Sequence, residues 1–274
     1  MTEKEILNLD EASELFQVST KTLLKMLREE AIPARKIGRE WRFARAALLH
    51  WIATGNSMNY TAPEEDNKAY FTEMAPVYDE LRMGFYGNAL RDLIIERYPP
   101  DLESSVADIG TGTGYLARGL AAKAGRVTAV DSSTAMLEVA GMELVKEGIH
   151  NVQLIEGDAY DLPLPDLSQE IVYANLLMHH LAEPVAALRE IFRILKPGGR
   201  AVITDVKDHG YSWVKDEKFD VWMGFNPEDI REWFEESDFR NIELIELGCN
   251  CRTSNRAGVA VEIPMFLATG LKAE

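Results

Sequence analysis

The chain of 274 residues has little of several features that mark particular classes of protein. It contains two cysteines, Cys249 and Cys251, too few for a disulfide framework or a four-thiolate zinc site. No apolar run approaches the roughly 18 residues that a membrane-spanning helix needs. The N-terminal stretch "MTEKEILNLDEASEL" lacks the apolar core of a secretory signal. Together these absences predict a cytoplasmic protein without a membrane partner.

Positive charge is also scarce, and it is unevenly distributed. The chain holds 29 Lys and Arg against 45 Asp and Glu, a net charge of −16. Residues 1–55 hold 9 basic and 8 acidic residues, so the remaining 20 basic and 37 acidic residues give residues 56–274 a net charge of −17. This asymmetry predicts two domains with different partners, and it argues against a general polyanion-binding surface on the second domain.

The N-terminal 55 residues are richer in basic residues than the rest of the chain. Their sequence predicts a helix, a turn, a second helix, a hairpin and a third helix. Apolar residues at helical spacing predict helices over 9–16 and 21–30, with Asp10 capping the first and Ser19 or Thr20 the second. Alternation on either side of a glycine predicts a two-stranded hairpin, followed by a third helix.

This pattern, over about residues 10–52, resembles the excisionase-like DNA-binding domains, relatives of the MerR type, although Ala31 stands where that family often has glycine. The resemblance implies a winged helix-turn-helix with a recognition helix at about 20–29 and a wing at about 35–42, from which Trp41 and Phe43 pack inward. The alternative is a solvated helix face in a domain that binds protein. The implied DNA-contacting residues are Thr20, Lys21, Thr22, Lys25, Arg28, Lys36, Arg39 and Arg42.

The domain boundary is expected where the pattern stops. Residues 1–55 form the first domain, and the polar, aperiodic residues 56–68 predict a linker. In residues 69–274, strands alternate with helices from about residue 105 onward, which predicts a doubly wound, mostly parallel α/β sheet. Two late apolar stretches would close that sheet with one antiparallel edge strand.

The motif "DIGTGTG" places Gly110, Gly112 and Gly114 in the first strand-to-helix turn, where glycines let a ligand approach the backbone. By itself this motif also fits a nicotinamide dinucleotide fingerprint. Acidic residues near three strand ends decide between a nicotinamide dinucleotide and a different nucleoside ligand.

Each acid suits one part of a nucleoside ligand. Asp108, before the first glycine, can bind an α-amino group. Asp131 ends the second strand, where it can accept both hydroxyls of a ribose, and Asp158 follows the third strand, where it can meet an adenine amine.

This series, together with "YFTEMAPVYDE", "VTAVDSSTAMLEVA" and "LREIFRILKPGGRAVITD", resembles the class I S-adenosylmethionine-dependent methyltransferases over about residues 70–270, nearest the ubiquinone/menaquinone-type branch. The resemblance implies S-adenosyl-L-methionine as cofactor and a seven-stranded Rossmann-like sheet. It also implies that Tyr78 covers the pocket and that Asn175 and Leu176 lie under the methionine part. The full set of implied cofactor contacts is Tyr78, Asp108, Gly110, Thr111, Gly112, Gly114, Asp131, Ser132, Met136, Asp158, Ala159, Asn175 and Leu176.

Methyl transfer needs alignment and exclusion of water, and a base only where the acceptor must lose a proton. Candidates for such a base are His179, His180, Tyr86 and Asp205, although "MHHL" can equally be scaffold. No metal is expected, since no Cys/His set has zinc spacing.

The paired cysteines leave two interpretations open. Cys249 and Cys251 would share one face of a strand, either as plain thiols or as ligands for a soft ion.

Two functions remain open. The chain is either an enzyme that methylates an unidentified small molecule and carries a DNA-binding module, or a DNA-binding regulator that senses S-adenosylmethionine or a small ligand. Methylation of DNA is disfavoured, because "ANLLM" stands where amino-methylating DNA enzymes carry Asn/Asp-Pro-Pro-aromatic. Residues 70–98 and the aromatic-rich residues 206–225, either a lid or a packed helix, would select the acceptor. A homodimer is compatible with this organisation.

Overall fold

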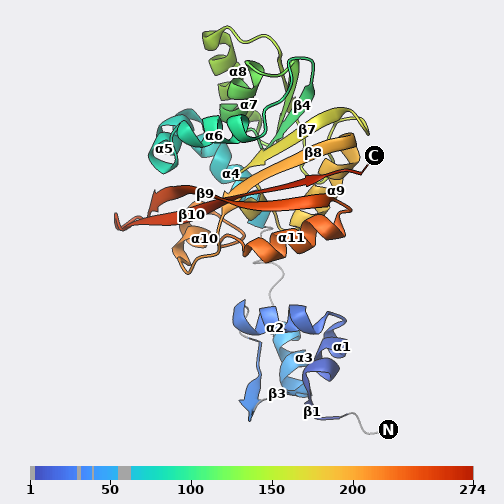
Figure 1. Cartoon of the computed structure of the whole chain (residues 1–274). Coiled ribbons are helices and arrows are strands. Elements are labelled where there is room, and N and C mark those ends of the chain that lie inside the picture. Colours follow the sequence, from blue (N-terminus) through green and yellow to red (C-terminus); the bar gives the residue numbers. More distant parts are fainter. Residues whose placement is uncertain (1–3, 30–31, 39, 55–62, 274) are drawn as a thin grey trace. The chain divides into compact units, whose positions relative to one another are not determined.

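The computed structural model describes residues 4–29, 32–38, 40–54 and 63–273 (Figure 1). The chain divides into two compact units, residues 1–60 and 61–274. Among the described residues, no helix combines the length and the apolar character needed to cross a membrane.

The N-terminal unit contains the three predicted helices and the hairpin, and its described residues form one strand more. Its strands are all antiparallel and lie in the order β1-β3-β2, with Lys36 opposite Trp41 in the hairpin. A short strand before the first helix completes this sheet, and two residues are too few to be recognised from alternation. The elements are β1 (Ile6–Leu7), α1 (Leu9–Phe16), α2 (Thr20–Glu29), β2 (Arg35–Ile37), β3 (Glu40–Ala44) and α3 (Arg45–Thr54).

Helix α1 is capped by Asn8 rather than by Asp10. The Asn8 side chain accepts from the Glu11 backbone N–H and the Glu11 carboxylate accepts from the Asn8 N–H, both at 2.9 Å, which is a capping box. Ser19 accepts from the Thr22 N–H at 3.0 Å at the start of α2, as expected. Phe43 is fully buried and Trp41 packs against the same small core.

The C-terminal unit is a seven-stranded sheet in the order β6-β5-β4-β7-β8-β10-β9, with helices on both faces. The strands from β6 to β8 are parallel, and β10 runs antiparallel to both of its neighbours. The predicted doubly wound fold is thus confirmed. Its elements are α4 (Pro63–Met74), α5 (Tyr78–Phe85), α6 (Ala89–Arg97), β4 (Ser105–Ile109), α7 (Tyr115–Ala121), β5 (Arg126–Asp131), α8 (Thr134–Glu147), β6 (Val152–Glu156), β7 (Gln169–Asn175), α9 (Pro184–Ile194), β8 (Leu195–Val206), α10 (Trp213–Lys218), α11 (Pro227–Glu236), β9 (Arg240–Ser254) and β10 (Ala260–Leu271).

The position of one strand and the start of one helix differ from expectation. The antiparallel strand lies inside the sheet rather than at its edge, and its continuous buried stretch Met265–Ala268 is typical of a strand covered on both faces. Helix α4 begins at Pro63, within the expected linker 56–68. Proline at the first helical position, followed in the sequence by three acidic residues, favours a helix N-terminus there.

The sheet separates two apolar layers. On one face α9 and α11 contribute Leu188, Ile191 and Phe234 to the core. On the other face α6 and α7 contribute Ile94 and Leu116. With both faces covered, a ligand can reach this sheet only at the ends of its strands.

Candidate active site

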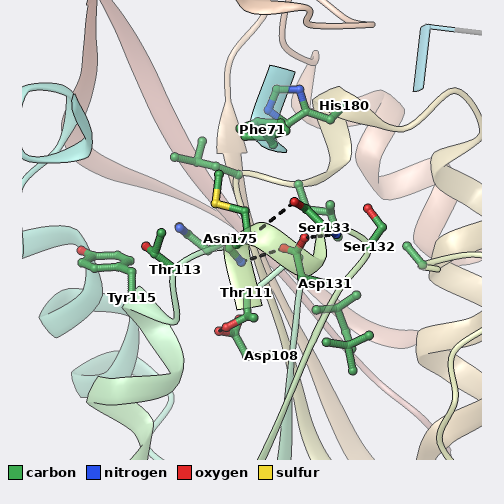
Figure 2. A pocket seen from close by; sticks show the side chains of 18 of the residues that line it. Phe71, Asp108, Thr111, Thr113, Tyr115, Asp131, Ser132, Ser133, Asn175 and His180 are labelled. Carbon is green, nitrogen blue, oxygen red and sulfur yellow. Dashed lines mark hydrogen bonds between the residues drawn. The ribbon is translucent and has the colours of Figure 1, made fainter. Parts of the chain in front are cut away.

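A cavity of about 870 Å³ lies at the carboxyl ends of β4, β5, β6 and β7, where ligands bind in doubly wound folds. Residues of α4 and α5, among them Phe71 and Tyr78, form its other side. Figure 2 shows Phe71 and His180 on the side of this pocket away from Asp108. We call it the first cavity.

The glycine loop after β4 owes its shape to three positive φ angles, at Gly110, Gly112 and Gly114. Gly110 has φ +68°, and a Cβ there would lie 2.7 Å from Cδ1 of Leu177. Gly112 has φ +55°, and a Cβ on it would meet nothing within 4 Å. The loop therefore bends away from the sheet and leaves room for a ligand against its backbone. Gly114, the residue before α7, is absent from the described lining of the first cavity.

Asp131 is held by the loop beside it. Its Oδ2 accepts from the Gly112 N–H at 2.7 Å, and its Oδ1 accepts from the Ser133 N–H at 2.9 Å (Figure 2). Burial raises the pKa of this carboxyl, and the backbone N–H bonds oppose that rise. These two backbone bonds fix the carboxylate at the wall of the first cavity.

Asp108 is almost completely buried beneath the same loop. The Thr111 hydroxyl donates to its Oδ2 at 2.6 Å and the Ala117 N–H donates to the same oxygen at 3.1 Å. Burial raises the pKa of Asp108 to about 7. A carboxyl in this position is poised to ionise when a cation binds next to it.

The other predicted cofactor contacts surround the same space. The Thr204 hydroxyl donates to Oδ1 of Asn175 at 2.6 Å, and Leu176 adopts φ +54°, uncommon for a side-chain-bearing residue. The predicted residues that line the first cavity are Tyr78, Asp108, Gly110, Thr111, Gly112, Asp131, Ser132, Met136, Asp158, Ala159, Asn175 and Leu176.

Arg82 is a lining residue that the sequence motifs did not indicate. Its guanidinium lies 4.0 Å from the centroid of the Tyr115 ring, and its Nη1 donates to the Gly87 carbonyl at 3.2 Å. The side chain is 4% exposed and lines the first cavity. One signal could have identified it, since Arg82 follows Tyr78 by four positions and therefore shares its helix face.

A second, smaller cavity of about 90 Å³ adjoins the first. The two share a wall of five residues, Phe71, Tyr78, Tyr86, Leu176 and His180. The remaining walls of the second cavity combine five aromatic or aliphatic residues with six polar or titratable ones. They are Tyr70, Phe85, His179, Val206, His209, Val214, Lys218, Asp220, Cys251, Thr253 and Ile263.

The segment 206–225 is therefore divided between two roles. Val214, Lys218 and Asp220 line the second cavity, whereas Trp222 and Phe225 pack into the main core. It is a wall of the cavity that is anchored by its aromatic residues, rather than only a lid or only a packed helix.

His179 lies between two carboxylates. Its Nδ1 is 2.7 Å from Oδ1 of Asp205, and its Nε2 is 3.9 Å from Oδ1 of Asp220. Burial alone would lower the pKa of His179, but the two carboxylates outweigh burial and raise it to about 9. Burial raises the pKa of Asp220 to about 6, opposed by the charge on His179. At neutral pH His179 is therefore an imidazolium that faces Asp220.

His180 is neutral beside this pair. Asn67 donates from Nδ2 to Nδ1 of His180 at 2.8 Å and to the Phe219 carbonyl at 2.9 Å. Burial and the neighbouring charge of His179 hold the pKa of His180 well below its usual range. Three of the four predicted base candidates, His179, His180 and Tyr86, line the second cavity, while Asp205 stands behind His179.

One group of described side chains offers metal-ligand spacing. His179, His180 and Asp220 each place a donor atom within 4.8 Å of the others. Cys249 and Cys251 are free thiols on one face of β9. Both pack against the apolar layer to which α6 and α7 contribute. Only Cys251 lines the second cavity, and burial raises its pKa to about 12.

In the N-terminal unit, the predicted DNA contacts differ in exposure. Lys21, Thr22 and Lys36 are exposed, whereas Thr20 is half-buried. Arg42 is also half-buried, pairs with Glu40 and donates to the Trp41 carbonyl at 3.0 Å. Arg39 and the side chains of Lys25 and Arg28 lie outside the described part of the chain.

Both units resemble known families. Residues 107–203 match the family model of a methyltransferase domain, and residues 6–56 match that of a helix-turn-helix domain. The chain is 32% identical over 187 residues to 2-methyl-6-phytyl-1,4-hydroquinone methyltransferase of Arabidopsis thaliana, which covers 65% of this chain and 53% of that protein. It is 34% identical over 140 residues to demethylmenaquinone methyltransferase of Clavibacter sepedonicus, which covers 50% of this chain and 56% of that protein.

Among solved structures, a SAM-dependent methyltransferase from Aquifex aeolicus superposes with a TM-score of 0.57 at 19% identity. The superposition covers 74% of this chain and 97% of the other, and it shows a shared fold. The chain spans about half the length of the curated relatives that it matches.

Proposed function

We propose that this chain, a methyltransferase of the S-adenosylmethionine-dependent class with a helix-turn-helix domain at its front, methylates a small hydroxylated aromatic molecule and binds DNA. The proposed methyl transfer rests on the fact that the two cavities adjoin. Because residues such as Leu176 and His180 line both cavities, a methyl donor in the first and an acceptor in the second would lie next to each other.

The residues of the first cavity suit S-adenosylmethionine. The Asp108 carboxyl can pair with the α-amino group, Asp131 can accept from the ribose hydroxyls, and Asp158 lines the same cavity, where it can accept from the adenine amine. Arg82 supplies a buried positive charge for the carboxylate of the methionine part. The bound cofactor supplies an activated methyl group on its sulfonium, and the protein orients it and excludes water.

The second cavity suits a hydroxylated ring. Tyr70, Phe71 and Phe85 provide aromatic walls, and His179 with Asp220 provides a polar end. Two of the relatives described above act on quinol-type molecules by their names, which supports a hydroquinone ring as the acceptor class.

Calorimetry with S-adenosylmethionine on the full chain tests the cofactor, and formation of S-adenosylhomocysteine with methylhydroquinone tests the reaction. We expect binding in the micromolar range and turnover. Absence of cofactor binding would refute the proposal. A gel shift on the DNA upstream of the coding sequence, at stated salt, tests the helix-turn-helix, and loss of the shift only at high salt is expected.

One feature favours the second function, a regulator that senses the cofactor. Helix α4 is the first described element after the N-terminal unit, and it contributes Asn67, Lys68 and Phe71 to the first cavity. Cofactor-dependent DNA affinity without turnover of any acceptor would support that function, whereas turnover with equal DNA affinity in both states would exclude it.

A further inference from the structure

We propose that Asp220 and His179 form a clamp for the acceptor's hydroxyl group, in which Asp220 accepts the hydroxyl proton and His179 donates a hydrogen bond to the oxygen. The inference rests on the proposed methyl transfer to a hydroxylated ring. It assigns the residues that prepare the acceptor, which the cofactor motifs leave open.

The spacing of the two groups carries the inference. His179 and Asp220 both line the second cavity, and His179 Nε2 lies 3.9 Å from Asp220 Oδ1, too far for a direct hydrogen bond. One oxygen atom between them can lie within about 2.8 Å of both. A hydroxyl placed there donates to the carboxylate and accepts from the imidazole at the same time.

Hydrogen bonds to neighbouring groups hold His179 and the segment that carries Asp220 in place. Asp205 is fully buried and holds His179 at two points, at Nδ1 over 2.7 Å and at the backbone N–H over 3.2 Å. This contact directs Nε2 into the second cavity. The carbonyl of His179 accepts from the N–H groups of Val221 and Trp222, both at 3.0 Å, and so anchors the segment that carries Asp220.

The charges suit the two roles. A carboxylate that takes up a proton near neutral pH suits Asp220, and an imidazolium suits stabilisation of a developing phenolate. The hydroxyl proton passes to Asp220. The electron pair left on the acceptor forms the bond to the methyl carbon, at oxygen or at the adjacent ring carbon, and the S–CH₃ bond breaks with its pair staying on sulfur. Methylation at carbon is completed when that carbon loses its own proton and the ring regains aromaticity.

A metal ion would be the other use of this cluster, and two contacts disfavour it. His180 Nδ1 already accepts a hydrogen bond from Asn67, whose Nδ2 is fixed by the Phe219 carbonyl. The Asp220 carboxylate lies 3.6 Å from this occupied nitrogen. A metal bound through His180 Nδ1 would therefore have to displace the Asn67 amide from that nitrogen.

The test compares Asp220→Asn and His179→Gln with Asp208→Asn, which removes an exposed carboxylate that lines neither cavity. Two readouts are needed. The first is kcat for methylhydroquinone at saturating S-adenosylmethionine, and the second is calorimetric binding of methylhydroquinone or its dimethyl ether to the full chain saturated with S-adenosylhomocysteine. Cofactor affinity is measured for every variant.

For Asp220→Asn we expect kcat to fall by about 10²- to 10⁴-fold, and for His179→Gln by about 10²-fold or more, with cofactor affinity and Asp208→Asn unchanged. Wild type should bind the diol at least about tenfold more tightly than the dimethyl ether, and Asp220→Asn should lose that difference.

Three outcomes would overturn the clamp while leaving the proposed function intact. They are wild-type kcat in Asp220→Asn, equal binding of diol and diether by wild type, and activity that disappears on treatment with EDTA and returns with a divalent metal. Failure of wild type to bind S-adenosylmethionine would instead count against the proposed function.

Discussion

Gly112 donates its backbone N–H to Oδ2 of Asp131 over 2.7 Å, which ties the glycine loop after β4 to the acid at the end of β5. The loop conformation and the orientation of the carboxylate are therefore set together. A substitution in either one is expected to disturb the other.

Asp131→Asn should weaken binding of S-adenosylmethionine by about 10- to 100-fold, because an amide offers only one acceptor oxygen where the carboxylate accepts from two N–H groups. Calorimetry on the full chain measures this. Glu138→Gln, on the exposed side of α8, is the matched control and should bind as wild type. Unchanged affinity in Asp131→Asn would exclude a direct role for this carboxylate.

Binding of S-adenosylmethionine should release a proton near neutral pH. Burial raises the pKa of Asp108 to about 7, so part of the free protein is protonated there. A bound ammonium group lowers that pKa, so binding expels the proton and affinity rises between about pH 6 and 8. Calorimetry in buffers of different ionisation enthalpy counts the protons. An Asp108→Asn chain should release none, and equal release by both chains would contradict this assignment.

The pH profile of kcat at saturating substrates should be bell-shaped. Activity requires ionised Asp220 and protonated His179, so it rises through about pH 6 and falls above about pH 9. The other groups that face the pair are Asp205, His180, His209, Lys218 and Cys251. Asp220→Asn should lose the acidic limb, and an acidic limb retained in that variant would assign it to another group.

Lys36→Ala should weaken DNA binding and reduce the salt dependence of binding by about one phosphate contact. Lys36 is exposed on the hairpin, with its ammonium 5.8 Å from the Trp41 ring centroid. Fluorescence anisotropy with labelled duplex across several salt concentrations gives the slope. Lys4→Ala, which removes a side chain paired with Glu11 at 2.6 Å, serves as control. An unchanged slope would remove Lys36 from the interface.

The fold, and the residues of the glycine loop and strand ends that line the first cavity, could be predicted from sequence because local patterns determine them. Glycines with positive φ and acids at strand ends, such as Gly110 and Asp131, are tied to a strand-to-turn geometry that alternation reveals. The position of β10 could not be derived in the same way. Which strand pairs with which depends on contacts between distant segments.

The residues that the motifs missed lie on helices, and their roles come from packing. Asn67 is a polar residue of α4 that its sequence alone would place at the surface, and Arg82 is indicated only by its position four residues after Tyr78 on α5. They are buried because α4 and α5 lie over the cavities. The pairing of His179 with Asp220 likewise joins residues that are 41 positions apart (220 − 179).

Since α4 begins at Pro63 and its Asn67 bonds both His180 and the Phe219 carbonyl, the boundary chosen for a shortened chain has a practical consequence. A catalytic fragment cut at residue 69, where the sequence pattern placed the domain start, would lose Asn67 and Lys68. The His180 ring and the segment after α10 would each lose a partner. The C-terminal unit prepared alone should therefore start before Pro63. In a fragment cut at 69, damage to the first cavity could be mistaken for dependence on the helix-turn-helix domain.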